Sequence, residues 1–371
     1  MPDPRSNSRP TARGLKARRG TLAASVGRPI ELPMMEPPAA GAIPAGWRVI
    51  GARELAEHLL SIRFLLLLVV MGVAGGFVVL KLTQTIQQVA GVIAGQPYFN
   101  GQTYPVFLYL FSQPPAAGDT SLQAIPSFAG VIAVFLGPLL GLAFGFDAIS
   151  NERAEGTLPR LVSQPIHRDD VINGKFVASL SVVALMLGAV MLTLAGLGIF
   201  GLGVVPSGDV ALRLVTWFFV AVLYVAFWLA FALLASVVFR RAATAALTVL
   251  AVWLILTFFG GSIVSTLAGF FAPYGSSSTV AQQLSNANMT TTLYGLLPNG
   301  MFNQITAVLL NPDLNSLNPI APDPTGRAVA ALLPFQQSVL IVWPQIVLLV
   351  GLTVVCFGVA YVAFMRQEVR A

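Results

Sequence analysis

Apolar residues in this chain are gathered into six long runs that polar segments separate. Most runs reach or exceed the roughly 18–20 residues that a helix needs to cross a bilayer. The alternating pattern of a membrane β-barrel is missing from the sequence, and backbone inside lipid must satisfy its own hydrogen bonds, so we expect helices. The chain is therefore predicted to be an all-α polytopic membrane protein. Its expected spans are residues 64–81, 128–147, 176–204, 214–238, 242–270 and 337–364.

Composition agrees with a membrane-embedded chain and excludes an ordinary soluble domain. Hydrophobic residues make up 56% of the 371 residues and charged residues only 10%, against about 25% charged residues in soluble proteins. The third and fifth spans are longer than a bilayer requires, so we expect them to tilt or protrude. Pro138 in the second span and the pair Gly260 and Gly261 in the fifth are candidate bend sites, which membrane helices tolerate.

Residues 1–46 are rich in Pro, Ala and Arg and show no apolar period. This composition predicts a disordered tail whose basic side chains could contact anionic lipid. An extension without a role of its own is the competing interpretation. The tail lacks the apolar core of a signal peptide, so we do not expect it to be one.

Residues 47–63 have the pattern of an amphipathic helix, which we expect to lie in the cytosolic membrane interface before the first span. The competing interpretation is that this segment only extends the first span. Arg53 and Glu57 stand four residues apart, a spacing at which opposite charges pair on a helix. His58 falls on the polar face and is expected to be solvated. The apolar face consists of Ala52, Leu55, Ala56, Leu59 and Ile62, and the polar face of Arg53, Glu54, Glu57, His58 and Ser61.

Two long outer loops, residues 82–127 and 271–336, are rich in small polar residues yet keep apolar patches. Loops of this length in a compact protein usually have a function or an ordered structure. We expect short helices near Val280–Leu284 and Gly300–Leu310, packed over the outer mouth of the spans. The sequence leaves open whether these loops bind substrate or only cover the spans.

Positive charge is divided unevenly between the two sides of the predicted bundle. Three of the 21 Lys and Arg residues lie on the outer side, and the other eighteen lie in the N-terminal part, in residues 148–175, in the turn at Arg240 and Arg241, and at the C-terminus. The positive side faces the cytosol, so we expect a plasma (inner) membrane protein with both termini cytosolic. Charge that follows the spans in this way argues against nucleic acid as a partner.

The sequence offers little to a metal ion or to ATP. Its two histidines, His58 and His167, and its single cysteine, Cys356, do not form a metal-ligand pattern. Residues 173–176 lack the first glycine and the hydroxyl residue of a phosphate-binding loop. We therefore expect no cofactor in this chain and no ATPase site of its own. Asp147, at the cytosolic end of the second span, either pairs with a nearby Arg or takes part in gating.

Residues 148–175 form a polar segment between two apolar runs. Gly156 can end one helix, and Thr157 can cap a short second helix that Pro165 ends. Leu161 and Val162 would then be exposed on a cytosolic loop, a situation that usually indicates a partner surface. The competing interpretation is an ordinary loop with a satisfied turn.

This segment resembles the signature of permeases of the type 2 ATP-binding-cassette transporters. The six spans, the entry helix and the cytosolic termini are also similar to that family, over roughly residues 47–371. The long outer loops resemble the subgroup that includes the membrane component of the nitrous-oxide-reductase maturation exporter. The matching residues are Asp147, Glu152, Arg153, Gly156, Thr157, Leu158, Ser163, Gln164, Pro165, Arg168, Gly174 and Lys175.

The resemblance implies a permease subunit, with export as the expected direction. A second permease subunit would pair with it, as a homodimer or with a related chain, and a separate dimeric ATPase would bind ATP and Mg²⁺. Residues 157–163 would form a coupling helix seated in a groove of the ATPase, and Arg240 and Arg241 would make a secondary contact. The coupling residues carried over are Glu152, Arg153, Gly156, Thr157, Leu158, Leu161, Val162, Pro165, Arg168 and Lys175.

Two other functions are compatible with the apolar spans. An ATP-independent carrier or channel needs no ATPase partner, and an intramembrane enzyme or sensor would use the outer loops. The spans carry hydroxyl groups, such as those of Thr193 and Thr257, but no ring of charges. This pattern favours an amphipathic or lipid-like cargo, or a drug, over a small ion.

Overall fold

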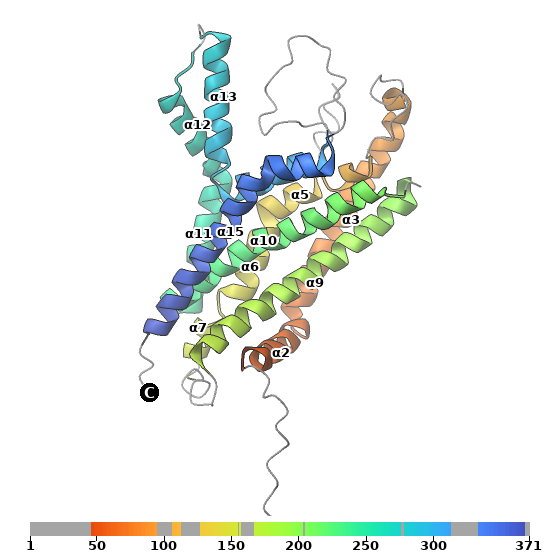
Figure 1. The fold of residues 1–371 in the computed structure, drawn as a ribbon. Helices are drawn as coiled ribbons and strands as arrows, with labels where there is room; N and C mark the ends of the chain where they lie inside the picture. The colour runs from red at the N-terminus through yellow and green to blue at the C-terminus, as the bar shows by residue number, and fades with distance from the viewer. Residues whose placement is uncertain are drawn as a thin grey trace, which may run out of the picture. The chain divides into compact units, whose positions relative to one another are not determined.

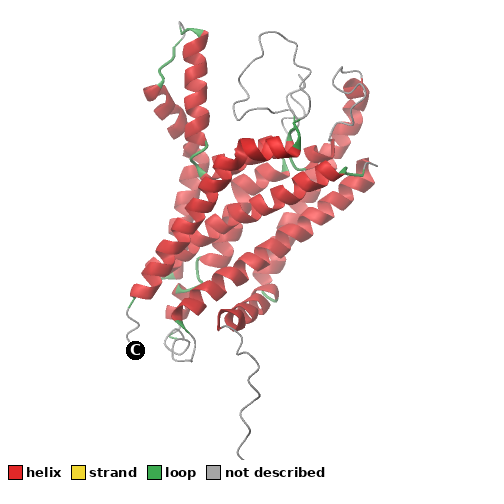
Figure 2. Ribbon diagram, in the orientation of Figure 1, coloured by secondary structure: helices red, strands yellow, loops and turns green. Residues whose placement is uncertain are grey.

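The computed structural model describes residues 46–94, 106–112, 127–154, 156, 167–202, 205–275, 278–312 and 333–367. All regular elements in these ranges are helices (Figures 1 and 2). Six of them are long and apolar enough to cross a membrane, which confirms the predicted fold class. The predicted tail lies outside these ranges except for Gly46. The six segments are Ile62–Lys81, Phe128–Ala154, Arg168–Gly201, Gly208–Val238, Ala242–Phe271 and Phe335–Arg366.

The predicted entry helix is separate from the first span, but it ends earlier than expected. Helix α2 covers Gly46–Leu59 and helix α3 covers Ile62–Ala94. Ser61 lies at the break, where its hydroxyl donates to the carbonyl of His58 at 2.6 Å and accepts from the amide of Phe64 at 3.2 Å. A serine that accepts from an amide three residues later caps a helix, so Ser61 starts α3.

The second span contains a turn of π-helix that the sequence explains in part. It runs through α5 (Phe128–Val131), η3 (Ile132–Leu136), α6 (Gly137–Gly145) and α7 (Ser150–Ala154). Pro138 has no N–H to donate to the carbonyl of Val134, and the amide of Gly137 bonds back to Ile132. The carbonyls of Ala133 and Val134 instead accept from Tyr224 at 2.6 Å and from Trp253 at 2.8 Å. Neighbouring helices therefore satisfy the backbone groups that the proline frees.

Helix α10 is the most enclosed of the spans. It covers Gly208–Val238 and packs against α6, against α9 (Arg168–Leu202) and against α15 (Phe335–Arg366). Figure 1 shows α9, α10 and α15 running side by side. Helices α9 and α10 begin eight and six residues before the predicted starts of their spans. These added turns carry polar residues, which is why the apolar pattern did not predict them.

The fifth span leads into the two outer helices. It consists of α11 (Ala242–Leu254), η4 (Ile255–Phe259) and α12 (Gly260–Phe271), with the π turn directly before the predicted bend site. Helix α12 packs against α13 (Val280–Tyr294), and α14 packs against α10 and α15 (Figure 1). Both outer helices cover the predicted positions, and α13 continues ten residues further. Helix α14 covers Pro298–Leu310, and the short helix η2 in the first outer loop covers Val106–Leu110.

Arg213, one of the three basic residues expected on the outer side, lies in the first turns of α10, and its side chain is completely buried. Its guanidinium donates to Asp209 at 2.7 Å, to the carbonyl of Leu309 at 2.9 Å and to the hydroxyl of Ser338 at 3.0 Å. A fourth donation, at 2.5 Å, goes to the carbonyl of Leu333. Four acceptors compensate the lost hydration of the buried charge, so Arg213 joins α10 to the ends of α14 and α15.

Glycines of α6 allow the second span to approach α10 closely. A Cβ atom at Gly141 would stand 2.5 Å from Cβ of Trp228 and 2.6 Å from the amide nitrogen of Leu229. At Gly145 a Cβ atom would stand 2.7 Å from Cβ of Ala232. Since backbone atoms cannot move aside cheaply, this helix pair requires glycine, as close helix pairs in membranes often do.

Gly141→Ala is expected to destabilise the protein by about 1–3 kcal/mol, the usual cost of overpacking. Gly76→Ala in α3 is the matched control, because nothing lies within 4 Å of a Cβ atom there and alanine favours a helix by up to about 1 kcal/mol over glycine. The melting temperature of the purified protein measures both. Equal melting temperatures for the two variants would contradict close packing at Gly141.

Candidate functional site

Lys175 lies at the centre of a buried polar cluster at the end of the bundle where α2 and α7 meet α9. Its ammonium group is 2.6 Å from a carboxylate oxygen of Glu54 on α2 and 2.8 Å from one of Glu152 on α7. The lysine side chain is only 7% exposed. One buried cation therefore joins three helices, and removal of that cation would leave two buried carboxylates without their partner.

Gly174 explains why α2 can pack so tightly here. A Cβ atom at Gly174 would lie 3.0 Å from the side chain of Ile50 and 3.0 Å from the carbonyl of Trp47. Helix α2 and helix α9 form one of the most extensive helix pairs in the described chain. The Gly-Lys pair thus has two separable roles: the glycine admits α2, and the lysine holds it through Glu54.

The orientation of α2 differs from the prediction in a way that defines the cluster. His58 and Glu54 turn toward α9, whereas Ala52, Ala56 and Leu59 of the predicted apolar face are exposed. His58 is not solvated, because its ring packs edge-on against Phe144 at 5.2 Å and its Nε2 lies 3.3 Å from the hydroxyl of Ser179. The inner stripe of α2 therefore combines apolar Ile50 and Leu55 with polar Glu54 and His58, and Glu54 pairs with Lys175 of α9.

Asp147 makes an ion pair between the second span and the start of the first. Its carboxylate accepts from Arg63 at 2.6 Å, and the same guanidinium lies 5.6 Å from the ring centre of Phe146. Of the two roles expected for Asp147, pairing with a nearby arginine and gating, the structure shows the pairing. It also fixes α3 beside the end of α6, directly next to the Lys175 cluster.

Arg153 and Arg168 meet the C-terminal end of the described chain. Arg153 donates to the side-chain oxygen of Gln367 and, at 3.4 Å, to the carbonyl of Val237 at the end of α10. Arg168 donates to the backbone carbonyl of Gln367 at 3.3 Å. Ser236 of α10 accepts from the amide of Ile149 at 3.0 Å. The junction after the second span is therefore attached to α10 and α15.

The remaining predicted coupling residues divide into two groups. Gly156 has φ of 66°, a left-handed conformation that glycine adopts without strain, and it is exposed, as are Arg240 and Arg241 in the turn between α10 and α11. Thr157, Leu158, Leu161, Val162 and Pro165 lie outside the described residues.

The cluster can hold helices in place. Among the described residues no group of His, Cys, Asp and Glu side chains could hold a metal ion. The sequence pointed to Lys175 and Glu152 through their motif but missed Glu54. The signal was available, because Glu54 and His58 stand four residues apart on one face of α2. Because Glu54 and His58 are polar, their face of the helix was expected to point toward solvent.

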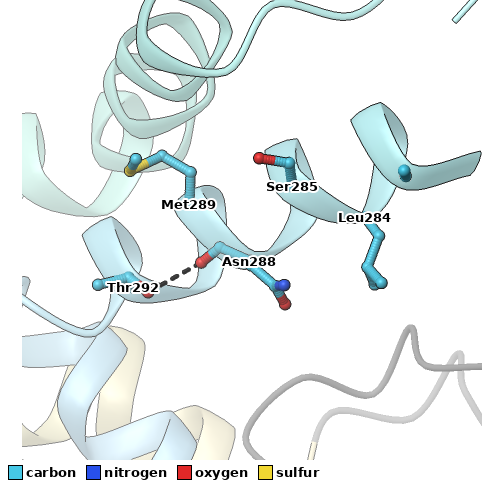
Figure 3. Close-up of a pocket in the computed structure, with 6 residues that line it drawn as sticks. Leu284, Ser285, Asn288, Met289 and Thr292 are labelled. Atoms are coloured by element: carbon cyan, nitrogen blue, oxygen red, sulfur yellow. Dashed lines mark hydrogen bonds between the residues drawn. The ribbon is translucent and has the colours of Figure 1, made fainter. Parts of the chain in front are cut away.

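Hollows occur among the described outer elements. One follows a single face of α13, where Figure 3 shows Leu284, Ser285, Asn288, Met289 and Thr292 in successive turns. The hydroxyl of Thr292 donates to the backbone carbonyl of Asn288 at 2.9 Å. These residues form a groove open along one helix, without a titratable group. The second hollow lies between the second span and α14 and is more enclosed.

Six helices that are long and apolar enough to cross a membrane define a multi-pass membrane protein. Comparison of sequences gives the family, since the model of the "ABC-2 family transporter protein" family matches residues 48–369. The chain therefore belongs to the ABC-2 transporter family.

Two curated relatives match a shorter stretch. A "Probable ABC transporter permease protein NosY" of Stutzerimonas stutzeri is 38% identical over 68 residues, which cover 18% of this chain and 25% of that protein. The protein of the same name from Pseudomonas aeruginosa is 34% identical over 73 residues, covering 19% and 26%. The chain thus spans about a quarter of the length of the curated relatives it matches.

Lys175→Met should lower the free energy of unfolding by about 3–5 kcal/mol, the cost of leaving buried charges without a partner. Arg53→Met is the control, because the Arg53–Glu57 pair is exposed and such pairs contribute about 0–1 kcal/mol. Chemical or thermal unfolding of the purified protein measures both. Glu54→Gln and Glu152→Gln added to Lys175→Met should recover part of the loss; a triple variant no better than Lys175→Met would contradict the charge argument.

Attachment of α2 should weaken on acidification. Burial lowers the pKa of His58 from about 6.5, although the carboxylate of Glu54 opposes this shift. The unfolded or detached form then binds more protons, so the contribution of His58 is complete above about pH 6.5 and is lost as the pH falls toward the lower folded value.

Hydrogen exchange of α2, corrected for intrinsic rates, should therefore show protection decreasing from pH 7 to pH 5.5. His58→Gln removes the titrating group and should flatten this dependence. An equally steep loss of protection in the variant would assign the effect to the other acidic groups near α2, Glu54, Glu57 and Asp147, and would refute the role of His58.

Proposed function

We propose that this chain is the permease subunit of an ABC exporter in the plasma (inner) membrane, with both termini in the cytosol. A separate ATPase dimer binds ATP and Mg²⁺ and supplies the energy. The chain pairs with a second permease subunit, either an identical copy or a related chain. The proposal rests on the family, and on the charge distribution, which concentrates Lys and Arg at the end of the bundle that contains α2 and α7.

The observation that carries the mechanism is the Lys175 cluster beside the segment 155–167. Lys175 ties α9, which follows that segment, to Glu152 on α7, which precedes it, and to Glu54 on α2. A force applied to the segment would therefore move α7, α9 and α2 together. Helices that move together in this way could carry a conformational change of the ATPase into the membrane-spanning part.

The predicted coupling residues then take two kinds of role. Thr157, Leu158, Leu161, Val162 and Pro165 would contact the ATPase, and Arg240 and Arg241 would make a second contact. Glu152, Arg153, Arg168 and Lys175 act from inside as positioning residues, because each is bonded to a neighbouring helix or to Gln367. Lys175 was grouped with the contact residues from its motif, but its burial makes an internal brace the better role.

ATP drives such a cycle only if the ATPase dimer binds the permease states with different affinity. The Arg63–Asp147 pair lies where those states would differ, between the start of the first span and the end of the second. Asp147 is therefore the candidate gating residue. The ion pair with Arg63 is partly exposed, so Asp147 could separate from Arg63 and pair with it again while both side chains stay in contact with water.

Capture of the partner tests the function. The tagged full-length chain, extracted in mild detergent from its native membrane, should retain an ABC ATPase identified by mass spectrometry. Replacement of residues 157–163 by a Gly-Ser segment should release that ATPase while the permease remains folded. Purification without any ATPase would favour the ATP-independent carrier, and retention by the replaced variant would refute the coupling segment.

Glu152→Gln and Gly156→Pro are each expected to lower transport at least about tenfold while ATP hydrolysis by the assembled complex continues. Glu152→Gln weakens the brace, and proline, whose φ is fixed near −65°, cannot adopt the φ of 66° at position 156. Glu57→Gln, an exposed change on α2, is the control and should transport normally. Normal transport by Glu152→Gln and Gly156→Pro would contradict the assignment.

A further inference from the structure

The cavity between the second span and α14 has features of a ligand site that the coupling function does not use. Its volume is about 560 Å³, inside the range of roughly 300–1,000 Å³ that is usual for small-molecule pockets. It lies at the start of the second span, at the opposite end of that span from α7. The described lining residues are Ser112, Ser127, Ala129, Gly130, Val131, Val134, Phe135, Asn303, Thr306, Ala307 and Asn311.

The wall of the cavity combines polar groups with apolar ones and has no charge among its described residues. Ser112, Thr306 and Asn311 are largely buried hydroxyl and amide side chains. Val131, Val134 and Ala307 supply apolar surface. An ion entering such a site would lose hydration without finding an opposite charge, whereas an uncharged group could exchange its hydrogen bonds with water for those of the wall.

Hydrogen bonds hold the polar groups of the wall in fixed positions. Ser112 donates to the side-chain oxygen of Asn311 at 2.9 Å, which joins the first outer loop to the end of α14. Trp217 of α10 donates to the hydroxyl of Thr306 at 3.0 Å. Asn303 donates to the hydroxyl of Tyr294 at 3.1 Å. A site whose polar groups are positioned in advance loses little entropy when a ligand binds.

The π turn η3 forms the other side of the cavity, where its side chains supply apolar surface. Val134 and Phe135 belong to this turn, and both line the cavity. The turn is fixed by donation from Trp253 to the carbonyl of Val134 and by ring contact between Phe135 and Trp253 at 6.2 Å. Phe135 is 47% exposed. Single π turns inside membrane or soluble helices are frequent at functional positions.

We propose that this cavity binds an uncharged amphipath, a molecule with a hydroxyl- or carbonyl-bearing head and an aliphatic or aromatic body. The head lies among Ser112, Asn303 and Thr306, and the body lies along Val134 and Phe135. Use of the cavity as a cargo site rests on the transport function proposed above, whereas binding itself does not.

Binding is measured on the full-length chain in phosphatidylcholine nanodiscs without the ATPase, by native mass spectrometry. The three probes carry aliphatic chains with the same number of carbon atoms: 1-monolauroylglycerol, dodecyl phosphate and dodecyltrimethylammonium. We expect saturable binding of one monolauroylglycerol per chain and at least tenfold weaker binding of the anion and the cation. Equal binding of all three probes would overturn the proposal, because it would show partition into lipid rather than a site.

Ala307→Phe places a ring in the cavity and should weaken monolauroylglycerol binding at least tenfold. Ala287→Phe is the matched control, because Ala287 is half-buried on the neighbouring helix α13 and does not line the cavity. Asn303→Leu removes a polar group at the surface of the wall, and a severalfold loss is expected even if Ala307→Phe does not fold. Unchanged binding in Asn303→Leu would overturn the proposal in that case, as unchanged binding in a folded Ala307→Phe would.

Two sources could supply such a ligand, and the assembled transporter distinguishes them. ATP-dependent movement of fluorescent monoacylglycerol across proteoliposomes, abolished by Ala307→Phe, identifies the ligand as cargo. A neutral lipid that co-purifies and remains bound during ATP turnover identifies it as a resident lipid; both results retain the site. Failure of the binding assay leaves capture of the ATPase unaffected, so the two proposals fail separately.

Discussion

The close contact between the glycine face of α6 and helix α10 is the constraint on which the rest of the structure depends. Glycine at positions 141 and 145 lets the two backbones approach, and the same helix pair is fastened at both of its ends. Tyr224 of α10 satisfies the carbonyl of Ala133 at one end, and Ser236 of α10 binds the amide of Ile149 at the other. Displacement of one end of the second span is thereby transmitted along α10.

This helix pair connects the two regions with functional features. The Lys175 cluster lies at the α7 end of the second span, where α2, α7 and α9 meet. The uncharged cavity lies at its other end, against the π turn. Interior packing is dense and resists compression, so we expect a shift imposed near residues 155–167 to reach the cavity wall through α6 and α10. The proposed coupling region and the proposed ligand site thus lie on one helix pair, an arrangement suited to a transporter subunit.

Prediction from sequence succeeded where a single property determines the structure and failed where two properties compete. Long apolar runs located all six spans, because only helices of that length are stable in lipid. His58 and Glu54 were assigned to solvent because they are polar, but Glu54 pairs with Lys175, which lies 121 positions away in the sequence, and this pair turns their face inward. Arg213 was counted only among the basic residues of the outer side, and no sequence pattern indicated that acceptors on α10, α14 and α15 and the carbonyl of Leu333 would bury it.

The sequence by itself determined the six apolar helices, the break in α-helical bonding at Pro138 and the absence of a phosphate-binding loop. These features follow from the local chemistry of each segment: its hydrophobicity, a missing N–H, a missing motif. Only the tertiary structure decided which partner each polar group obtains. Glu54 meets Lys175 across 121 positions and Ser112 meets Asn311 across 199. Pairings at such separations depend on how the helices pack, which no periodic pattern within a single segment encodes.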